Sequence, residues 1–146
     1  MKKLFIAALL AVTVTASAFA KDTKKVNGRA LSSFNVEFGK ASDVSWTATD
    51  NYAKATFVLN SEKMEVFYNT AGEKIGTSRT ISMDELPVKT KRAFAKDYSG
   101  YTVKESIEFD GVEESGYYIS AENEKESLVL KVNALNELTK YKATKK

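Results

Sequence analysis

An alternation of apolar and polar side chains over residues 55–79 restricts the fold of this chain more than any other feature of its sequence. In two short segments of this stretch every second residue is apolar, which is the pattern of a strand with one face on a core. Residues 60–63 suit a tight connection between the segments, and residues 69–72 end with a glycine, which adopts a positive φ at no steric cost. The stretch therefore predicts two consecutive β-hairpins.

The first twenty residues have the layout of a secretory signal peptide. Lys2 and Lys3 precede an apolar run over residues 4–14, which is too short to span a bilayer comfortably. Residues 18–20 form a small-x-small cleavage site, so residues 1–20 are a predicted signal peptide that is cleaved near Ala20. An N-terminal membrane anchor is the alternative. We therefore expect a periplasmic or secreted protein with no stable membrane insertion after cleavage.

The chain contains neither cysteine nor histidine. An exported fold without cysteine has no disulfides, so burial of apolar residues must stabilise it. The lack of histidine removes the commonest general base and the commonest metal ligand together. Removing Lys2 and Lys3 with the signal peptide lowers the formal net charge from +3 to +1. This balance gives no reason to expect a nucleic-acid partner.

Two short helices are predicted, and each is followed by four strands. Asn27 is suited to cap a helix over about residues 28–38, whose apolar residues recur at helical spacing. Residues 82–85 have the form of a capping box, and Pro87 suits the first position of a second helix that ends near Tyr98. The predicted strands cover residues 44–49, 52–59, 64–68 and a segment ending near 81, then 101–109, 116–121, 127–132 and 138–142.

The two halves of the chain match each other at a spacing of about sixty residues. Phe34 of the first helix matches Phe94 of the second, and Asn69 and Asn133 each open the turn after the third strand of their half. Coincidence between two generic α+β patterns is the alternative. A helix laid across its sheet buries the apolar faces of both. We therefore predict an α+β fold of tandem αββββ repeats, each a helix packed on a four-stranded antiparallel meander sheet.

Five stretches resemble the β-lactamase-inhibitor-like, PepSY-like family of small exported bacterial proteins. These are residues 38–46, 52–57, 66–75, 85–87 and 94–101. The polar residues after the cleavage site predict a flexible lead over residues 21–26. The resemblance implies a first PepSY-like repeat over 27–81, a second over 82–146, and a periplasmic location. The family name comes from structural likeness to a secreted protein that lays a concave sheet surface on β-lactamase, and likeness does not carry that activity over. Asn136 departs from the glycine usual at the end of its turn.

The sequence offers no arrangement of residues for catalysis. Without histidine or cysteine, nucleophilic catalysis would need a serine–lysine pair, and no serine lies in a recognisable elbow. Glu108, Asp110, Glu113 and Glu114 lie at a predicted hairpin tip, where a water-excluding site for hydrolysis is hard to build. A calcium site over residues 110–114 is the alternative, although the spacing matches no known motif. We predict no catalytic, cofactor-binding or metal-binding residues.

The remaining candidate is the face of each sheet that is turned away from its helix. If the odd-numbered residues over 52–59 face the helix, then the even-numbered ones and their cross-strand neighbours face outward. The predicted interaction surface consists of Thr56, Val58, Glu65, Phe67, Tyr118, Ser120, Val129 and Lys131. Phe67 and Tyr118 are expected to be exposed among polar groups and to act as interface anchors. The alternative is a face covered by its twin or by the lead segment.

Together these features predict an exported periplasmic, non-enzymatic module of inhibitor-like type that presents a sheet surface to a protein or peptide. No cofactor and no nucleic-acid partner are expected. A small-ligand carrier with a pocket between helix and sheet is the alternative, and a hydrolase ranks last. A large apolar cavity would favour the carrier, and a buried pair of carboxylates in a cleft would favour the hydrolase.

Overall fold

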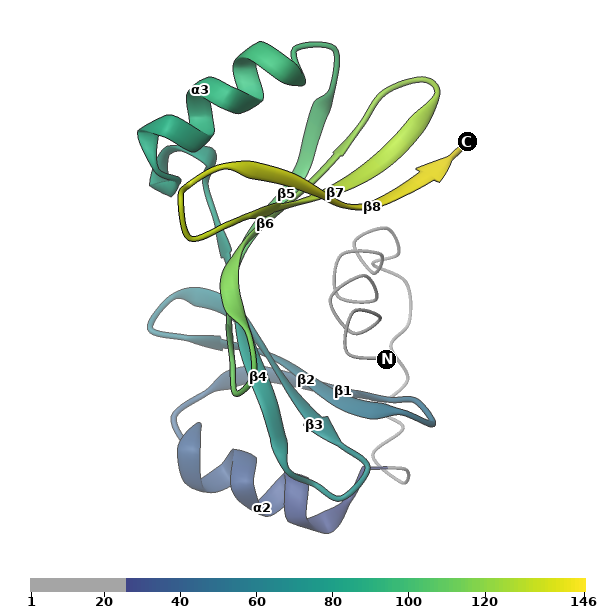
Figure 1. The fold of residues 1–146 in the computed structure, drawn as a ribbon. Helices are drawn as coiled ribbons and strands as arrows, with labels where there is room; N and C mark the ends of the chain where they lie inside the picture. Colours follow the sequence, from purple (N-terminus) through teal and green to yellow (C-terminus); the bar gives the residue numbers. More distant parts are fainter. Residues whose placement is uncertain (1–25) are drawn as a thin grey trace. The chain divides into compact units, whose positions relative to one another are not determined.

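The structure is a computed structural model and describes residues 26–146. Its elements are α2 (Gly28–Glu37), β1 (Ser42–Ala48), β2 (Tyr52–Leu59), β3 (Glu62–Asn69), β4 (Lys74–Ile81), the 3-10 helix η2 (Met83–Glu85), α3 (Val88–Asp97), β5 (Thr102–Gly111), β6 (Ser115–Glu122), β7 (Glu126–Val132) and β8 (Leu138–Lys145). Both predicted helices and all eight predicted strands are present (Figure 1). The predicted signal peptide over residues 1–20, and the lead except for Val26, lie outside the described residues.

The eight strands belong to one antiparallel sheet in the order β1-β2-β3-β4-β5-β6-β7-β8, in which neighbours are hydrogen-bonded. The prediction of tandem αββββ repeats, each with its own four-stranded sheet, is therefore wrong, although helices and antiparallel strands still make an α+β fold. The physical reason is visible just after β5, where the N–H of Val112 donates to the carbonyl of Ile75 in β4 at 3.0 Å. Backbone groups that would be unpaired at the edge of a separate sheet are thereby satisfied.

The described residues divide into two compact units, and each is considered by itself. The α2 unit contains residues 26–80 together with Phe109–Ser115. The α3 unit contains Ile81–Glu108 and Gly116–Lys146. The end of β5 and the turn that follows it therefore pack with the first four strands.

Asn27 fixes the start of α2 and ties it to the β3–β4 turn. Its side-chain oxygen accepts a hydrogen bond from the backbone N–H of Arg29 at 2.8 Å, and its amide nitrogen donates to the carbonyl of Thr70 at 3.1 Å. Gly72 lies beside this cap with a φ of 81°, and a Cβ there would be only 2.9 Å from Asn27 Oδ1. The predicted cap is confirmed, and it also joins the helix to its sheet.

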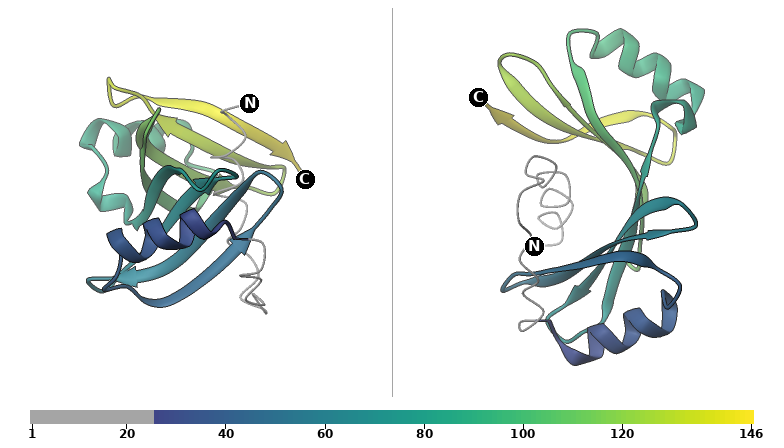
Figure 2. Two further views of the ribbon diagram at one scale, coloured as in Figure 1. Left: turned by 90° about the horizontal axis from the view of Figure 1, so that it is seen from below. Right: turned by 180° about the vertical axis from the view of Figure 1, so that it is seen from behind.

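Helix α2 lies across one face of its strands (Figures 1 and 2). Aromatic rings fill the layer between the helix and these strands. The ring centroid of Phe34 lies 5.3 Å from that of Trp46 and 5.1 Å from that of Phe57. Tyr68 of β3 adds a further ring, 5.9 Å from Trp46. Each fully buried ring contributes roughly 1.5–3 kcal/mol relative to an exposed one. A helix of ten residues is marginal by itself, so this packing stabilises it.

The capping box over residues 82–85 is present, but it serves η2 and not α3. The Glu85 carboxylate accepts a hydrogen bond from the backbone N–H of Ser82 at 2.8 Å, which closes the short helix. Leu86 and Pro87 are then extended, with ψ values of 151° and 142°, so α3 begins only at Val88. Pro87 is the residue before the helix rather than its first residue.

Aliphatic side chains dominate the layer between α3 and its strands. Phe94 packs there against a cluster that includes Ile119, Leu128 and Leu130, each at most 1% exposed. Thr90, which is fully buried, donates to the carbonyl of Asn136 at 2.9 Å. This bond ties α3 to the β7–β8 turn, as Asn27 ties α2 to the β3–β4 turn.

Candidate functional site

The face of β1–β4 turned away from α2 carries the predicted interaction residues of the α2 unit. Phe57, Val66 and Tyr68 belong to the core beneath α2, so their alternating neighbours lie on the opposite side. We call this opposite side the Lys54 face. Strand register places on it Tyr52, Lys54, Thr56, Val58, Lys63, Glu65, Phe67, Gly76 and Ser78.

A nearly buried ion pair lies at the centre of the Lys54 face. Lys54 is 4% exposed, and its Nζ donates to Glu65 Oε1 at 3.1 Å. The hydroxyl of Thr56 lies 3.4 Å from the same oxygen, and that of Ser78 lies 3.5 Å from Oε2. Burial, and then the charge of Glu65, raise the pKa of Tyr52 above its ordinary value. The Glu65 carboxylate thus accepts hydrogen bonds from three side chains of this face, those of Lys54, Thr56 and Ser78.

Phe67 lies on the Lys54 face but is only 3% exposed, so the expectation that it is exposed is wrong. Its ring lies 6.0 Å from Tyr52 and 6.5 Å from Phe109, which reaches this face from the end of β5. Phe109 has room because Gly76, the residue opposite Phe67, has no side chain. A Cβ on Gly76 would be 2.7 Å from Phe109 Cζ. Phe67 therefore forms part of an aromatic wall beside Lys54.

Tyr118 is fully buried, so it too lacks the predicted exposure. It lies in the α3 unit, on the face of β6 away from the cluster beneath α3, and opposite Lys131 of β7. The ring of Tyr141 meets it edge-on at 5.7 Å, and Lys131 Nζ lies 5.7 Å from its ring centroid. Tyr141 reaches Tyr118 at an irregularity of β8, where the register with β7 shifts by one residue. Burial, and then Tyr141, raise the pKa of Tyr118 to about 12.

Two buried tyrosine hydroxyls, those of Tyr68 and Tyr118, have no hydrogen-bond partner among the residues that the structure describes. Tyr68 lies under α2, where burial and then the charge of Glu37 raise its pKa to about 12. Tyr118 lies on the side of its sheet that is away from α3. A buried hydroxyl without a partner costs free energy, because it has lost its hydrogen bonds to water.

The other predicted interaction residues are half-buried, and the structure brings some of them together. Thr56 and Glu65 are direct cross-strand partners in the α2 unit, as are Ser120 and Val129 in the α3 unit. Sequence reasoning missed Ser78 and Tyr141, which join these groups only through strand register. It placed Lys54 on the outward face by alternation, but nothing in the sequence indicated that Lys54 is buried. The possible role of the predicted residues in binding a partner stays a prediction.

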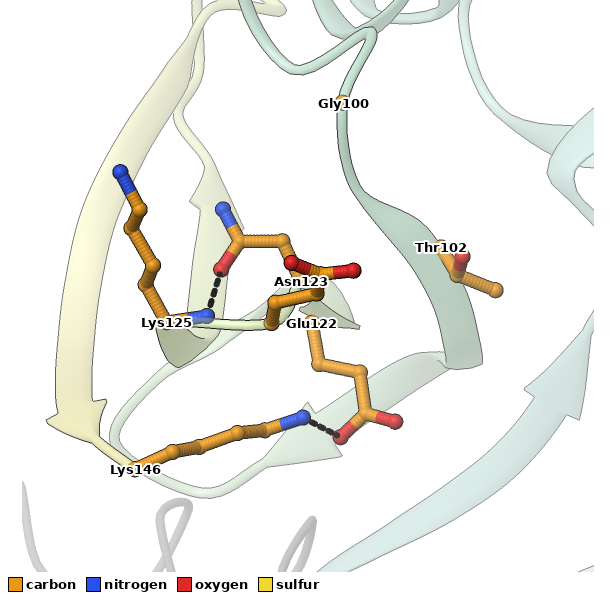
Figure 3. Close-up of a pocket in the computed structure, with 7 residues that line it drawn as sticks. Gly100, Thr102, Glu122, Asn123, Lys125 and Lys146 are labelled. Carbon is orange, nitrogen blue, oxygen red and sulfur yellow. Dashed lines mark hydrogen bonds and ion pairs between the residues drawn. The ribbon is translucent and has the colours of Figure 1, made fainter.

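A pocket of about 570 Å³ lies in the α3 unit near the β6–β7 turn (Figure 3). It is lined by Gly100, Thr102, Glu122, Asn123, Glu124, Lys125 and Lys146. Glu122 forms ion pairs with Lys104 at 2.9 Å and with Lys146 at 3.3 Å, and the hydrogen bonds of these pairs lower the pKa of the Glu122 carboxyl. The lining is largely polar and charged, unlike the apolar cavity that a carrier would need. The lining residues are different from those of the cluster beneath α3.

The carboxylates of residues 110–114, at the end of β5 and just after it, do not form a recognisable metal site. Asp110 accepts a hydrogen bond from the hydroxyl of Ser115 at 3.2 Å. In the part of the chain that the structure describes, no group of three or more aspartate or glutamate residues is placed to hold a metal ion. The calcium alternative over residues 110–114 therefore gains no support. Separately, none of the helices among residues 26–146 is long and apolar enough to cross a membrane.

No known protein-family profile matches the sequence, and no curated protein is significantly similar to it. Solved structures do match. A Bacteroides eggerthii protein, provisionally described as periplasmic, is 16% identical, with a TM-score of 0.70 over 82% of this chain and 88% of its own. A DUF2874 family protein from Bacteroides uniformis is 18% identical, with a TM-score of 0.70 over 82% of this chain and 89% of its own.

A BLIP-like protein from Bacteroides fragilis is 15% identical, with a TM-score of 0.67 over 86% of this chain and 92% of its own. BLIP-like refers to the β-lactamase-inhibitor protein. At these identities the likeness concerns the fold alone. Nothing in the comparisons tests the resemblance to PepSY-like proteins. The chain is thus similar in fold to a BLIP-like protein and to DUF2874 family proteins.

Proposed function

We propose that this protein is an exported periplasmic, non-enzymatic module that binds a protein or peptide through its Lys54 face. The observation that carries the proposal is the nearly buried pair of Lys54 and Glu65, set beside the ring of Phe67 on the sheet face away from α2. Withdrawing the Lys54 ammonium from water costs several kcal/mol. A fold stabilised by apolar burial gains little from such a pair, so a role in recognition accounts for it better.

The solved structures support the class and the location. The Bacteroides fragilis protein is described as BLIP-like, and the Bacteroides eggerthii protein is provisionally described as periplasmic. The second description agrees with the signal-peptide pattern over residues 1–20. The target of the module is a protein or peptide whose identity these likenesses do not carry over.

The two alternatives have less support. A small-ligand carrier needs room between helix and sheet, but Phe34, Trp46 and Phe57 fill that layer at ring separations of 5.1 and 5.3 Å. A hydrolase needs a pair of carboxylates in a water-excluding cleft. On the Lys54 face the buried partner of Glu65 is a lysine, and the remaining neighbours of its oxygens are hydroxyls.

The test is capture of proteins from a periplasmic extract by the protein and two single variants. Val58→Arg places a long charged side chain on the Lys54 face, whereas Val36→Arg places it on α2, where Val36 is 88% exposed. We expect the wild type and Val36→Arg to capture the same protein, and Val58→Arg to lose it by at least tenfold. Circular dichroism of each variant checks folding. Equal capture by all three proteins would rule out the Lys54 face as the binding site.

Phe67→Ala and Tyr118→Ala are unsuitable first variants because both side chains are buried. Truncating either one would create a cavity and destabilise the protein by roughly 3–5 kcal/mol. Lost capture would then report misfolding as readily as lost contact. Val58 is half-buried, so a larger side chain there extends toward solvent without emptying the core.

A further inference from the structure

The Lys54 ammonium has hydrogen-bonding capacity that the protein itself does not use. A lysine ammonium has three N–H donors. Within the described residues, its one hydrogen-bond partner is Glu65 Oε1, at 3.1 Å. The residue is nevertheless 4% exposed, so water reaches the ammonium poorly. A nearly buried cation with spare donors is costly unless another acceptor approaches it.

The acceptor that pairs with Lys54 is already well occupied. Glu65 Oε1 also lies 3.4 Å from the Thr56 hydroxyl, and Oε2 lies 3.5 Å from the Ser78 hydroxyl. The unused capacity of the cluster is therefore on the donor side. Register adds a second cation, Lys63, to the same face, opposite Val58. Two lysines face one carboxylate, so the cluster is complementary to a negative group.

The surroundings of Lys54 favour a strong interaction with such a group. Phe67 is its direct cross-strand neighbour and is itself packed between Tyr52 and Phe109. Apolar rings lower the local dielectric, which strengthens a charge-assisted hydrogen bond. The Glu65 side chain is 23% exposed, so the pair can be reached from solvent at this side. Thr56 and Val58, both half-buried, supply the adjoining contact area.

We propose that Lys54 is the anchor for an aspartate or glutamate side chain presented by the partner protein. This rests on the proposed function, in which the Lys54 face binds a protein. The partner carboxylate accepts hydrogen bonds from the Lys54 donors that Glu65 leaves unused. Glu65, itself bonded to the hydroxyls of Thr56 and Ser78, holds the ammonium in place. The aromatic wall formed by Phe67 and its neighbours then packs beside the incoming side chain.

The experiment is an NMR titration of isotope-labelled protein with two small probes. One is N-acetyl-glutamate N-methylamide, which carries a carboxylate, and the other is its neutral isostere, N-acetyl-glutamine N-methylamide. We expect saturable shifts of the Lys54 side chain and of the Thr56 and Ser78 amides with the carboxylate probe. The neutral probe is expected to bind at least tenfold more weakly. Equal effects of the two probes, or no saturable shift at these residues, would overturn the proposal.

Three variants complete the test. Lys54→Met is expected to weaken binding of the carboxylate probe at least tenfold. Lys40→Met, at an exposed lysine between α2 and β1 and outside the Lys54 face, is expected to leave that binding within twofold. Lys54→Met combined with Glu65→Gln removes both charges, so it keeps the test valid if the single variant fails to fold. Undiminished binding by a folded variant without Lys54 contradicts the proposal. If Val58→Arg still abolishes partner capture in that case, the proposed function stands and only the role of Lys54 is removed.

Discussion

The two helix-covered layers of this protein have the same outline but are filled by different side chains. Each lies beneath a helix of ten residues that buries a phenylalanine at its centre, Phe34 in α2 and Phe94 in α3. Phe34 touches three further rings, those of Phe38, Trp46 and Phe57. Phe94 stacks on Tyr98 and otherwise packs on a cluster rich in isoleucine and leucine.

The difference shows which features of such a layer are required and which can vary. A core tolerates exchange of apolar side chains when the total volume is kept. The connections between helix and turn are similar in kind, because in each unit a polar side chain of the helix region donates to a turn carbonyl. The hydrogen bond between helix and turn is thus the common feature of the two units, whereas the core can be aromatic or aliphatic.

The largest expected effect is the loss of a central helix ring. Phe34→Ala should destabilise the protein by about 4 kcal/mol, because it creates a buried cavity and removes three ring contacts. Phe94→Ala should cost about 3 kcal/mol, since Phe94 is 9% exposed and makes one stacked ring contact. Urea denaturation of both variants measures the difference. A larger loss for Phe94→Ala would contradict this ranking of the two layers.

Alkaline pH should destabilise both units through their buried tyrosines. The pKa values of Tyr68 and Tyr118 are raised from 10 to about 12, so both hydroxyls stay neutral in the folded state while they ionise in the unfolded chain. Their contribution is complete below pH 10 and is lost as the pH rises through 12, by about 2 kcal/mol each. Unfolding followed by circular dichroism from pH 9 to 12.5 measures the loss. Each tyrosine-to-phenylalanine variant should flatten the profile; an unchanged profile would refute the assignment.

The turns after β3 and β7 provide a comparison of backbone conformation. In both turns the side-chain oxygen of an asparagine, Asn69 or Asn133, accepts hydrogen bonds from the backbone N–H groups two and four residues further along the chain. In each turn the residue before the glutamate (Glu73 or Glu137) has a positive φ, which is 81° at Gly72 and 62° at Asn136. The departure of Asn136 from glycine therefore leaves the turn unchanged, because asparagine tolerates the left-handed region.

Substitutions at these two positions should have unequal effects. Gly72→Ala should destabilise the protein by about 1.5 kcal/mol, because of its positive φ and because a Cβ would lie 2.8 Å from that of Arg29. Asn136→Gly should change stability by less than about 0.5 kcal/mol. Thermal unfolding of both variants is the measurement. If Asn136→Gly is as damaging as Gly72→Ala, the two turns are not equivalent.

The last expected effect is a gain in stability. Tyr68→Phe and Tyr118→Phe should each stabilise the protein by about 1 kcal/mol at pH 7, because each removes a buried hydroxyl that has no partner within residues 26–146. Urea denaturation of the single variants checks this. Destabilisation by either substitution would mean that the hydroxyl makes a hydrogen bond in solution. Comparing the two variants shows whether an unpaired hydroxyl costs the same beneath α2, at Tyr68, as on the sheet face away from α3, at Tyr118.

The sequence by itself determined the helices, the strands and the side of the sheet on which each strand residue lies. Helical spacing placed Phe34 and Phe94 on buried faces, and the period of two placed Val66 beneath α2 and Glu65 opposite. Asn27 was recognisable as a cap from its position alone. These features could be predicted because they depend on residues that are close together along the chain.

Only the tertiary structure decided that the strands form one sheet and that Phe67 and Tyr118 are buried. Phe109 covers Phe67 across the gap left by Gly76, and a register shift in β8 brings Tyr141 against Tyr118. Each of these contacts joins residues that are far apart in the sequence. Alternation reveals which face a side chain lies on, but its burial depends on which distant side chain reaches that face. The same limit hid the burial of Lys54, on which the proposed binding site depends.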